Sequence, residues 1–76
     1  REEYVLSGVR IYPTQAALNQ VINIEAPQDA LLQVFDVHGQ EIYRTNEKSY
    51  RPAQAGIYFV RVSSLGRVYT QKVILR

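Results

Sequence analysis

Apolar residues in this chain recur at every second position, and this period limits the fold more than any other feature of the sequence. In residues 21–26, Ile22 and Ile24 fall on one side and the polar Asn23 and Glu25 on the other. Successive side chains of a β-strand point to opposite faces, so this alternation predicts a strand. Further runs of alternating or β-branched residues occupy segments 9–12, 31–37, 40–45, 49–51, 57–63 and 68–75.

Turn-forming residues separate these runs. Pro13 closes the first run, because proline cannot donate a ladder hydrogen bond. His38 and Gly39 stand between two runs as the two central residues of a hairpin, and we expect Gly39 to adopt a positive φ there. We expect the same of Gly56, at the end of a longer turn. Asp36 precedes Gly39 by three residues, where its carboxylate can accept hydrogen bonds from turn N–H groups.

Short strands separated by turns in this way predict an all-β sandwich or a small barrel. Only residues 15–19 have a composition suited to a helical turn, and residues 4–6 would at most add a marginal first strand. The strand faces also predict which side chains are buried. The expected core comprises Ile22, Ile24, Leu32, Val34, Tyr58, Val60, Val62 and Val73.

The composition excludes several classes of protein. The 76 residues contain no cysteine and a single histidine, His38, which excludes a disulfide framework, a zinc finger and a cysteine nucleophile. No apolar run approaches the roughly 18 residues of a membrane-spanning helix, and no signal peptide opens the chain. We expect residues 1–8 to be a linker or a marginal first strand that joins a folded domain, residues 9–76, to a longer polypeptide.

The charge pattern does not favour nucleic acid as a partner. Nine Lys and Arg against seven Asp and Glu give a net charge of +2, and the basic residues are scattered rather than clustered. Most of the six Tyr fall in predicted strands, where an oligonucleotide-binding barrel would place its stacking aromatics. Without a basic cluster beside them, packing within the sheets is the better interpretation, and single-stranded nucleic-acid binding is the weakest alternative.

No catalytic constellation is visible in the sequence. The serines lack a G-x-S-x-G context, and His38 is expected in a hairpin tip, where its backbone matters more than its imidazole. Asp36 and Glu41 flank the same hairpin, but a turn cap explains Asp36 better than acid–base chemistry does. The glycines never reach a phosphate-loop spacing. We therefore expect neither an enzyme nor a bound cofactor or metal.

Four sequence blocks, however, follow one another in a distinctive order. They are VRIYP at 9–13, VFDVHGQEI at 34–42, AGIYFVRV at 55–62 and QKVIL at 71–75. Over nearly the whole chain they resemble the type A C-terminal sorting domain of type IX secretion cargo in Bacteroidetes. The family usually has Asn-Pro after its Tyr-Pro, where this chain has Thr14 and Gln15, and its usual Leu before Gly-Ile-Tyr is not obvious here. The recognition or structural positions that carry the resemblance are Tyr12, Pro13, Asp36, Gly39, Gly56, Tyr58, Lys72, Val73, Ile74, Leu75 and Arg76.

The resemblance implies a fold, a function and partners. The fold would be a seven-stranded antiparallel β-sandwich of immunoglobulin-like character. The domain would direct its parent protein through the periplasm and across the outer membrane by the type IX secretion system. A surface sortase would then usually remove the domain and attach the cargo to lipopolysaccharide, although some members keep the domain. The partners would be the outer-membrane translocation machinery and the sortase, without insertion of the domain into the membrane.

The terminal strand offers one physical route to such recognition. An unpaired strand edge can bind a partner through main-chain hydrogen bonds, and alternate side chains then provide selectivity. The same edges would allow dimerisation through edge strands. The alternative function is a passive β-sandwich spacer or adhesin module of a bacterial surface protein, which shares the fold but would not be needed for export.

Overall fold

The computed structural model describes residues 8–17 and 19–76, and among these residues it contains strands but no helix. No described segment is therefore a helix that could cross a membrane. The strands are β1 (Arg10–Tyr12), β2 (Gln15–Ala16), β3 (Ile22–Glu25), β4 (Leu31–Phe35), β5 (Glu41–Thr45), β6 (Ser49–Tyr50), β7 (Gly56–Ser64) and β8 (Arg67–Leu75). The marginal strand predicted at residues 4–6 lies outside the described residues.

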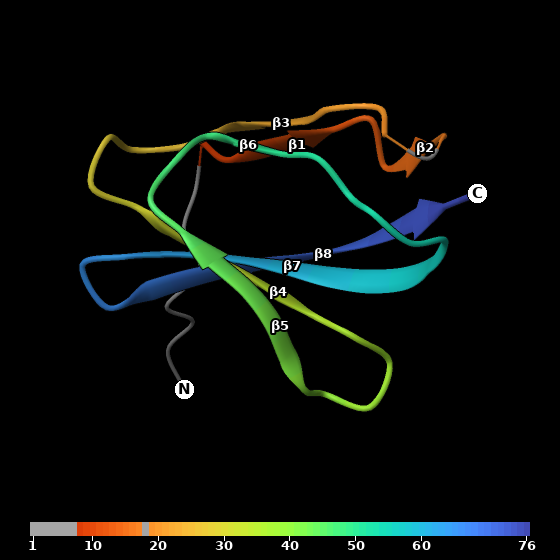
Figure 1. Ribbon diagram of the computed structural model, residues 1–76. Coiled ribbons are helices and arrows are strands. Elements are labelled where there is room, and N and C mark those ends of the chain that lie inside the picture. The colour runs from red at the N-terminus through yellow and green to blue at the C-terminus, as the bar shows by residue number, and fades with distance from the viewer. Residues whose placement is uncertain (1–7, 18) are drawn as a thin grey trace.

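The strands form two sheets that lie one above the other (Figure 1). The small sheet has the order β1-β3-β6, and the large sheet has the order β2-β8-β7-β4-β5. The all-β, two-sheet expectation is confirmed. The described residues differ from the expected seven antiparallel strands in two respects, since they form eight strands and one pair, β2 with β8, is parallel.

The parallel pair begins in residues 15–19, the one segment whose composition suits a helical turn. Gln15 and Ala16 are extended and pair with Ile74 and Leu75 at the end of β8. These two residues are extended rather than helical because their pairing satisfies backbone groups that would otherwise be unpaired on the edge of β8. The backbone N–H of Ile74 donates to the Thr14 carbonyl at 2.8 Å, and that of Arg76 donates to the Ala16 carbonyl at 3.0 Å.

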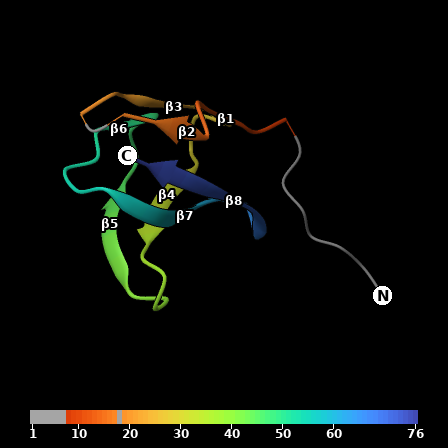
Figure 2. The same ribbon diagram turned by 90° about the vertical axis from the view of Figure 1, so that its right-hand side faces the viewer.

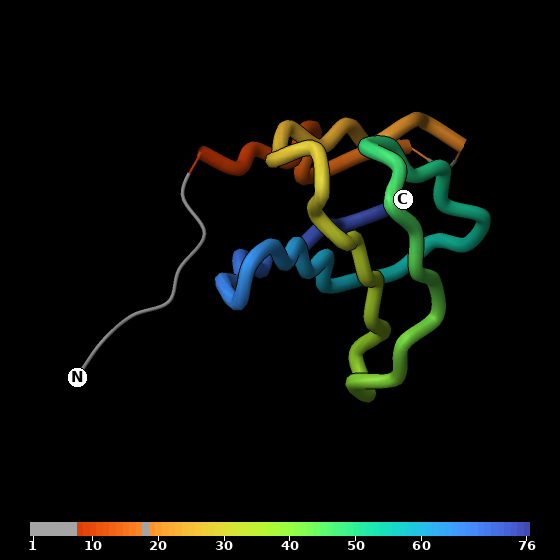
Figure 3. The backbone as a smooth tube through the Cα atoms, turned by 90° about the vertical axis from the view of Figure 1, so that its left-hand side faces the viewer, coloured from red at the N-terminus to blue at the C-terminus, as the bar shows by residue number. Residues whose placement is uncertain are grey.

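The core lies between the two sheets and is built from their inward-facing side chains. All eight residues predicted to be buried are buried, with Ile22, Val34 and Val73 at 0% exposure. Ile11, Ala16, Ala30 and Leu75 complete the buried apolar cluster. The period-two pattern located the core because each strand places alternate side chains against the opposite sheet. Figure 3 shows the two layers from the side, with the tip of the β4–β5 hairpin pointing away from the small sheet.

The hairpin connections are made by residues with positive φ. The β4–β5 hairpin was predicted with two central residues but has a three-residue loop, since the Asp36 N–H donates to the Gln40 carbonyl at 3.0 Å. Gly39, at φ 81°, is the loop residue with positive φ, which is typical of a turn followed by a left-handed residue. The β7–β8 hairpin has a two-residue turn in which Leu65 and Gly66 have φ values of 52° and 79°.

Candidate recognition surface

The terminal strand β8 lies inside the large sheet rather than at its edge. It pairs along its length with β7, and its last residues also pair with β2. Figure 2 shows this end of the chain beside β2. The sequence suggested that a partner could pair with the edge of this strand. At residues 74–76 such pairing is blocked, because β2 and Thr14 already bond those backbone groups.

The side chains at the end of β8 point alternately to the two faces of the sheet. Val73 and Leu75 are buried in the core, at 0% and 3% exposure. Lys72 is exposed and Ile74 half-buried on the opposite face, away from the small sheet. Arg76 donates from its guanidinium to the Gln15 side chain at 3.2 Å. A partner of the folded domain can thus reach Lys72, Ile74 and Arg76, whereas Val73 and Leu75 stabilise the sandwich.

The other motif residues lie in separate parts of the molecule. The Tyr12 hydroxyl donates to Glu25 at 3.2 Å, and the Arg10 guanidinium lies over the Tyr12 ring, 4.4 Å from its centroid. Pro13 follows, half-buried, after β1. This group stabilises the outer side of the small sheet. The structure does not join it to β8 in one site.

Asp36 and Gly39 shape the β4–β5 hairpin. One carboxylate oxygen of Asp36 accepts hydrogen bonds from the His38 N–H at 2.9 Å and from the Gln40 N–H at 3.0 Å. The turn cap predicted for Asp36 is therefore present. Since both bonds are local, they explain Asp36 without a role in chemistry.

Gly56 and Tyr58 form a second local unit, at the start of β7. Gly56 has φ 146°, and a side-chain carbon added there would lie 3.5 Å from the Tyr58 ring. The buried Tyr58 hydroxyl donates to the Gln54 carbonyl at 3.2 Å. Tyr58 thus packs its ring over the glycine and satisfies its hydroxyl with the turn that precedes β7.

The face of the large sheet that turns away from the small sheet carries an unusual mixture of side chains. We call it the outer face. Strand register places Phe35 of β4 opposite Phe59 of β7, and Phe59 opposite Lys72 of β8. Two residues before Phe59 on β7, Ile57 lies opposite Ile74 of β8. The apolar members of the outer face are Leu31, Phe35, Ile57, Phe59, Val68 and Ile74.

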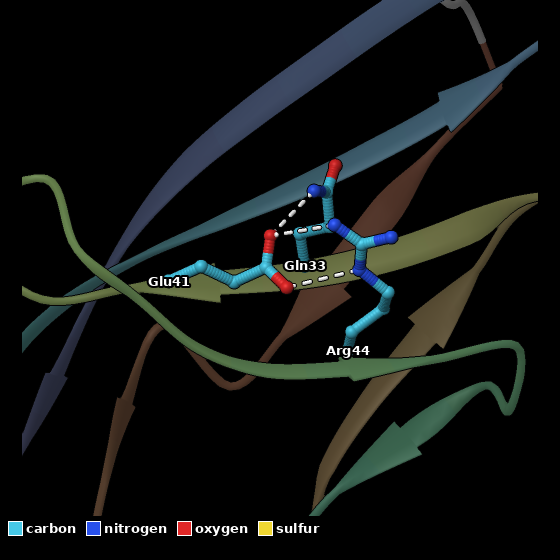
Figure 4. A network of polar contacts seen from close by, with 3 residues as sticks. All are labelled: Gln33, Glu41 and Arg44. Carbon is cyan, nitrogen blue, oxygen red and sulfur yellow. Dashed lines mark hydrogen bonds and ion pairs between the residues drawn. The ribbon is translucent and has the colours of Figure 1, made fainter.

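A polar network borders this face on β4 and β5 (Figure 4). Glu41 accepts hydrogen bonds from Arg44 at 2.9 and 3.1 Å and from the Gln33 amide at 2.8 Å. The hydrogen bond from Arg44, followed by that from Gln33, lowers the pKa of Glu41 below its usual value. Glu41 also raises the pKa of Arg44. Glu41 is therefore held as a carboxylate whose charge is already matched.

Two cations of the outer face lack such a match. Arg61 and Lys72 are both exposed and both neighbour Phe59, with Arg61 two residues further along β7 and Lys72 opposite on β8. Among the residues that the structure describes, neither has a carboxylate within ion-pair distance. Within residues 8–17 and 19–76, the outer face therefore combines partly exposed aromatic and aliphatic side chains with two cations that have no ion-pair partner.

A cavity of about 490 Å³ lies elsewhere, beside the edge strands β5 and β6. The Tyr43 and Tyr50 rings line it with centroids 5.0 Å apart, and burial is the main cause that raises the pKa of Tyr50. Within residues 8–17 and 19–76, no three Asp, Glu or His side chains come together as metal ligands. The cavity has no arrangement of groups that indicates a reaction.

Sequence reasoning had not identified the outer face. It selected Lys72 and Ile74 but missed Phe35, Phe59 and Arg61, because alternation was used to separate core from surface. The available signal was the run at residues 31–37, which is mostly apolar on both faces. That pattern indicates a central strand, as β4 is, and it also places apolar side chains on the face that no second sheet covers.

Comparison with known proteins connects this chain to a described family. The family model of the secretion system C-terminal sorting domain matches residues 10–76. Curated relatives include Gingipain R2 from two strains of Porphyromonas gingivalis, each 35% identical to this chain over 63 residues. The similarity covers 83% of this chain but only 8% of the length of those relatives.

Proposed function

This chain belongs to the family of secretion system C-terminal sorting domains, and we propose how it acts as the export signal of its parent protein. The signal directs the parent across the outer membrane by the type IX secretion system, to the outer membrane, the cell surface or the medium. The observation that carries this function is the family match over residues 10–76, which includes every strand of both sheets. The signal is accordingly the whole folded sandwich rather than a short linear peptide.

Before recognition, the parent passes through the periplasm, where the domain folds. The folded unit is residues 9–76, and residues 1–8 link it to the cargo. The sandwich is of the immunoglobulin-like kind, with β2 as a short additional strand on the edge of β8. Two packed sheets with a shared apolar core support this assignment.

After export, a surface sortase usually removes the domain and attaches the cargo to lipopolysaccharide, although some members of the family keep the domain. The cleaved bond lies in or before residues 1–8, outside the sandwich. The domain itself is not an enzyme and needs no cofactor. Support comes from the family, whose role is sorting, and from the motif residues, whose hydrogen bonds serve turns and packing.

The motif positions divide into two roles. The secretion machinery contacts Lys72, Ile74 and Arg76, which the folded domain leaves accessible. The others maintain the fold that presents them, and these are Tyr12, Pro13, Asp36, Gly39, Gly56, Tyr58, Val73 and Leu75.

A transplant experiment tests the function. The chain is fused behind an unrelated protein that carries a periplasmic signal, in a bacterium with a type IX system and in a mutant lacking it. We expect the reporter at the surface only in the competent strain, and its loss of about 8.7 kDa after export if the sortase acts. Intact fusion retained in the periplasm of competent cells would refute the sorting function and favour a passive spacer.

A further inference from the structure

The two outward sides of the sandwich differ in chemistry. On the small sheet, the outward side chains are polar and satisfy one another: Arg10 contacts Glu25 at 3.5 Å, and Tyr12 donates to the same carboxylate at 3.2 Å. On the outer face of the large sheet, Phe59 lies opposite Lys72 and two residues before Arg61 on β7, and neither cation has a described carboxylate partner. An uncovered antiparallel sheet ordinarily presents polar side chains to water.

We propose that the outer face is the docking surface of this domain, and that its partner is an acidic, partly apolar protein surface of the secretion machinery. Apolar contacts would cover Phe35, Phe59, Ile57 and Ile74, and carboxylates of the partner would approach Arg61 and Lys72. The inference rests on the proposed function and adds to it the face that is used and the chemistry of the partner. When complementary charges surround an apolar centre, the interface associates quickly and selects its partner.

Charge also distinguishes this partner from two other possible occupants of the outer face, a second copy of the chain and an anionic lipid surface. A second copy docking the same face by two-fold symmetry would bring the cations of both copies together, and among the described residues the outer face has no free carboxylate to separate them. Glu41, the carboxylate on the border of the face, is already bound by Arg44 and Gln33. An anionic lipid surface attracts larger basic clusters than one arginine and one lysine, and stable membrane binding needs a second anchoring signal.

Charge-neutral variants of the fusion test the proposal in the competent strain. The double variant R61Q/K72Q removes two positive charges from the outer face. The matched control R10Q/R67Q removes the same net charge from exposed positions elsewhere. A third variant, R61K/K72R, keeps both charges. We expect export to fall by roughly five- to tenfold in R61Q/K72Q alone.

The wild-type fusion separates the hypothesis of a sorting function from the hypothesis that the outer face is the docking surface. If the wild type is not exported, the sorting function fails. If it is exported and R61Q/K72Q is exported equally well, or if R10Q/R67Q loses as much, the docking surface is wrong while the sorting function stands. Resistance to added protease confirms that each variant is folded.

Photo-crosslinking in cells identifies what covers the face. A photoreactive phenylalanine analogue is placed at Thr70, which is exposed and opposite Arg61, and for comparison at Asn23 on the small sheet. We expect Thr70 alone to crosslink to a protein of the secretion machinery, at a peptide rich in Asp or Glu, and the adduct to disappear in R61Q/K72Q. Adducts only with lipid, only with a second copy, or equally from Asn23 would overturn the proposal.

Discussion

At the scale of single residues, the effect of a substitution on stability depends more on how deeply the side chain is buried than on its type. Val60 is 1% exposed in the core, whereas Val37 is 59% exposed in the β4–β5 loop. Removing two methyl groups from Val60 leaves a cavity between the sheets. We expect Val60→Ala to lower the free energy of unfolding by about 1–3 kcal/mol. The matched control Val37→Ala should change it little, and equal effects in urea denaturation would contradict the described core.

The glycines give a second comparison at this scale. Gly39 and Gly56 both have the positive φ predicted from the sequence, at 81° and 146°. Alanine at Gly39 meets no neighbouring atom, so backbone strain alone should cost about 1 kcal/mol. Gly56 has a φ outside the left-handed region that other residues tolerate, and Tyr58 lies close. We expect Gly56→Ala to be the more destabilising in thermal unfolding, and the reverse order would contradict the account of these turns.

At the scale of elements, the β4–β5 hairpin depends on the side chain of Asp36. Asp36→Ala removes an acceptor for two backbone N–H groups, and we expect a loss of about 1–2 kcal/mol in the free energy of unfolding. Asp36→Asn keeps an oxygen at the same place and should lose less. Hydrogen exchange of the His38 and Gln40 amides measures the effect directly. Unchanged protection of both amides in Asp36→Ala would show that the cap does not hold the loop.

The neighbouring carboxylate links this hairpin to pH. Hydrogen bonds from Arg44 and Gln33 lower the pKa of Glu41 from its ordinary value of 4.5. The folded state therefore binds the proton less readily than the unfolded chain does. The resulting stability is present above the unfolded pKa and is lost as the pH falls through the lower folded pKa. We expect Glu41→Gln to lose less stability than the wild type on acidification below about pH 4.5, and an identical acid dependence would contradict the network.

Strand elements could be predicted from sequence because burial imposed the period of two. Core positions such as Ile22 and Val73 follow directly from alternation. The pairing of Gln15 and Ala16 with β8 could not be predicted, since it depends on which backbone groups remain unpaired after the sheet has formed. The three-residue loop at Gly39 could not be predicted either, since its length depends on which backbone groups close the hairpin, here the Asp36 N–H and the Gln40 carbonyl. The local sequence does not show which backbone groups will pair with one another in the folded chain.

At the scale of the whole molecule, the candidate site was only partly predictable. The motif resemblance selected Lys72 and Ile74, which share the outer face. It could not place Phe35 or Arg61 beside them, because that grouping arises from the register of β4, β7 and β8. Register depends on contacts distant in sequence. The proposed docking surface therefore exists only in the assembled sheet, and β8 must be tested both for its packing and for the side chains it presents.

The central claim is that β8 carries the export signal as part of the folded domain, and deletion of residues 72–76 tests it most directly. The measurement is surface exposure of the fused reporter. The deletion removes the buried Val73 and Leu75 and the pairing with β2, so we expect a protease-sensitive domain and a reporter left in the periplasm. The milder Lys72→Ala should stay folded and reduce export only through the outer face. Equal surface exposure with and without residues 72–76 would contradict the claim and move the signal to another face, around Gly39 or Gly56.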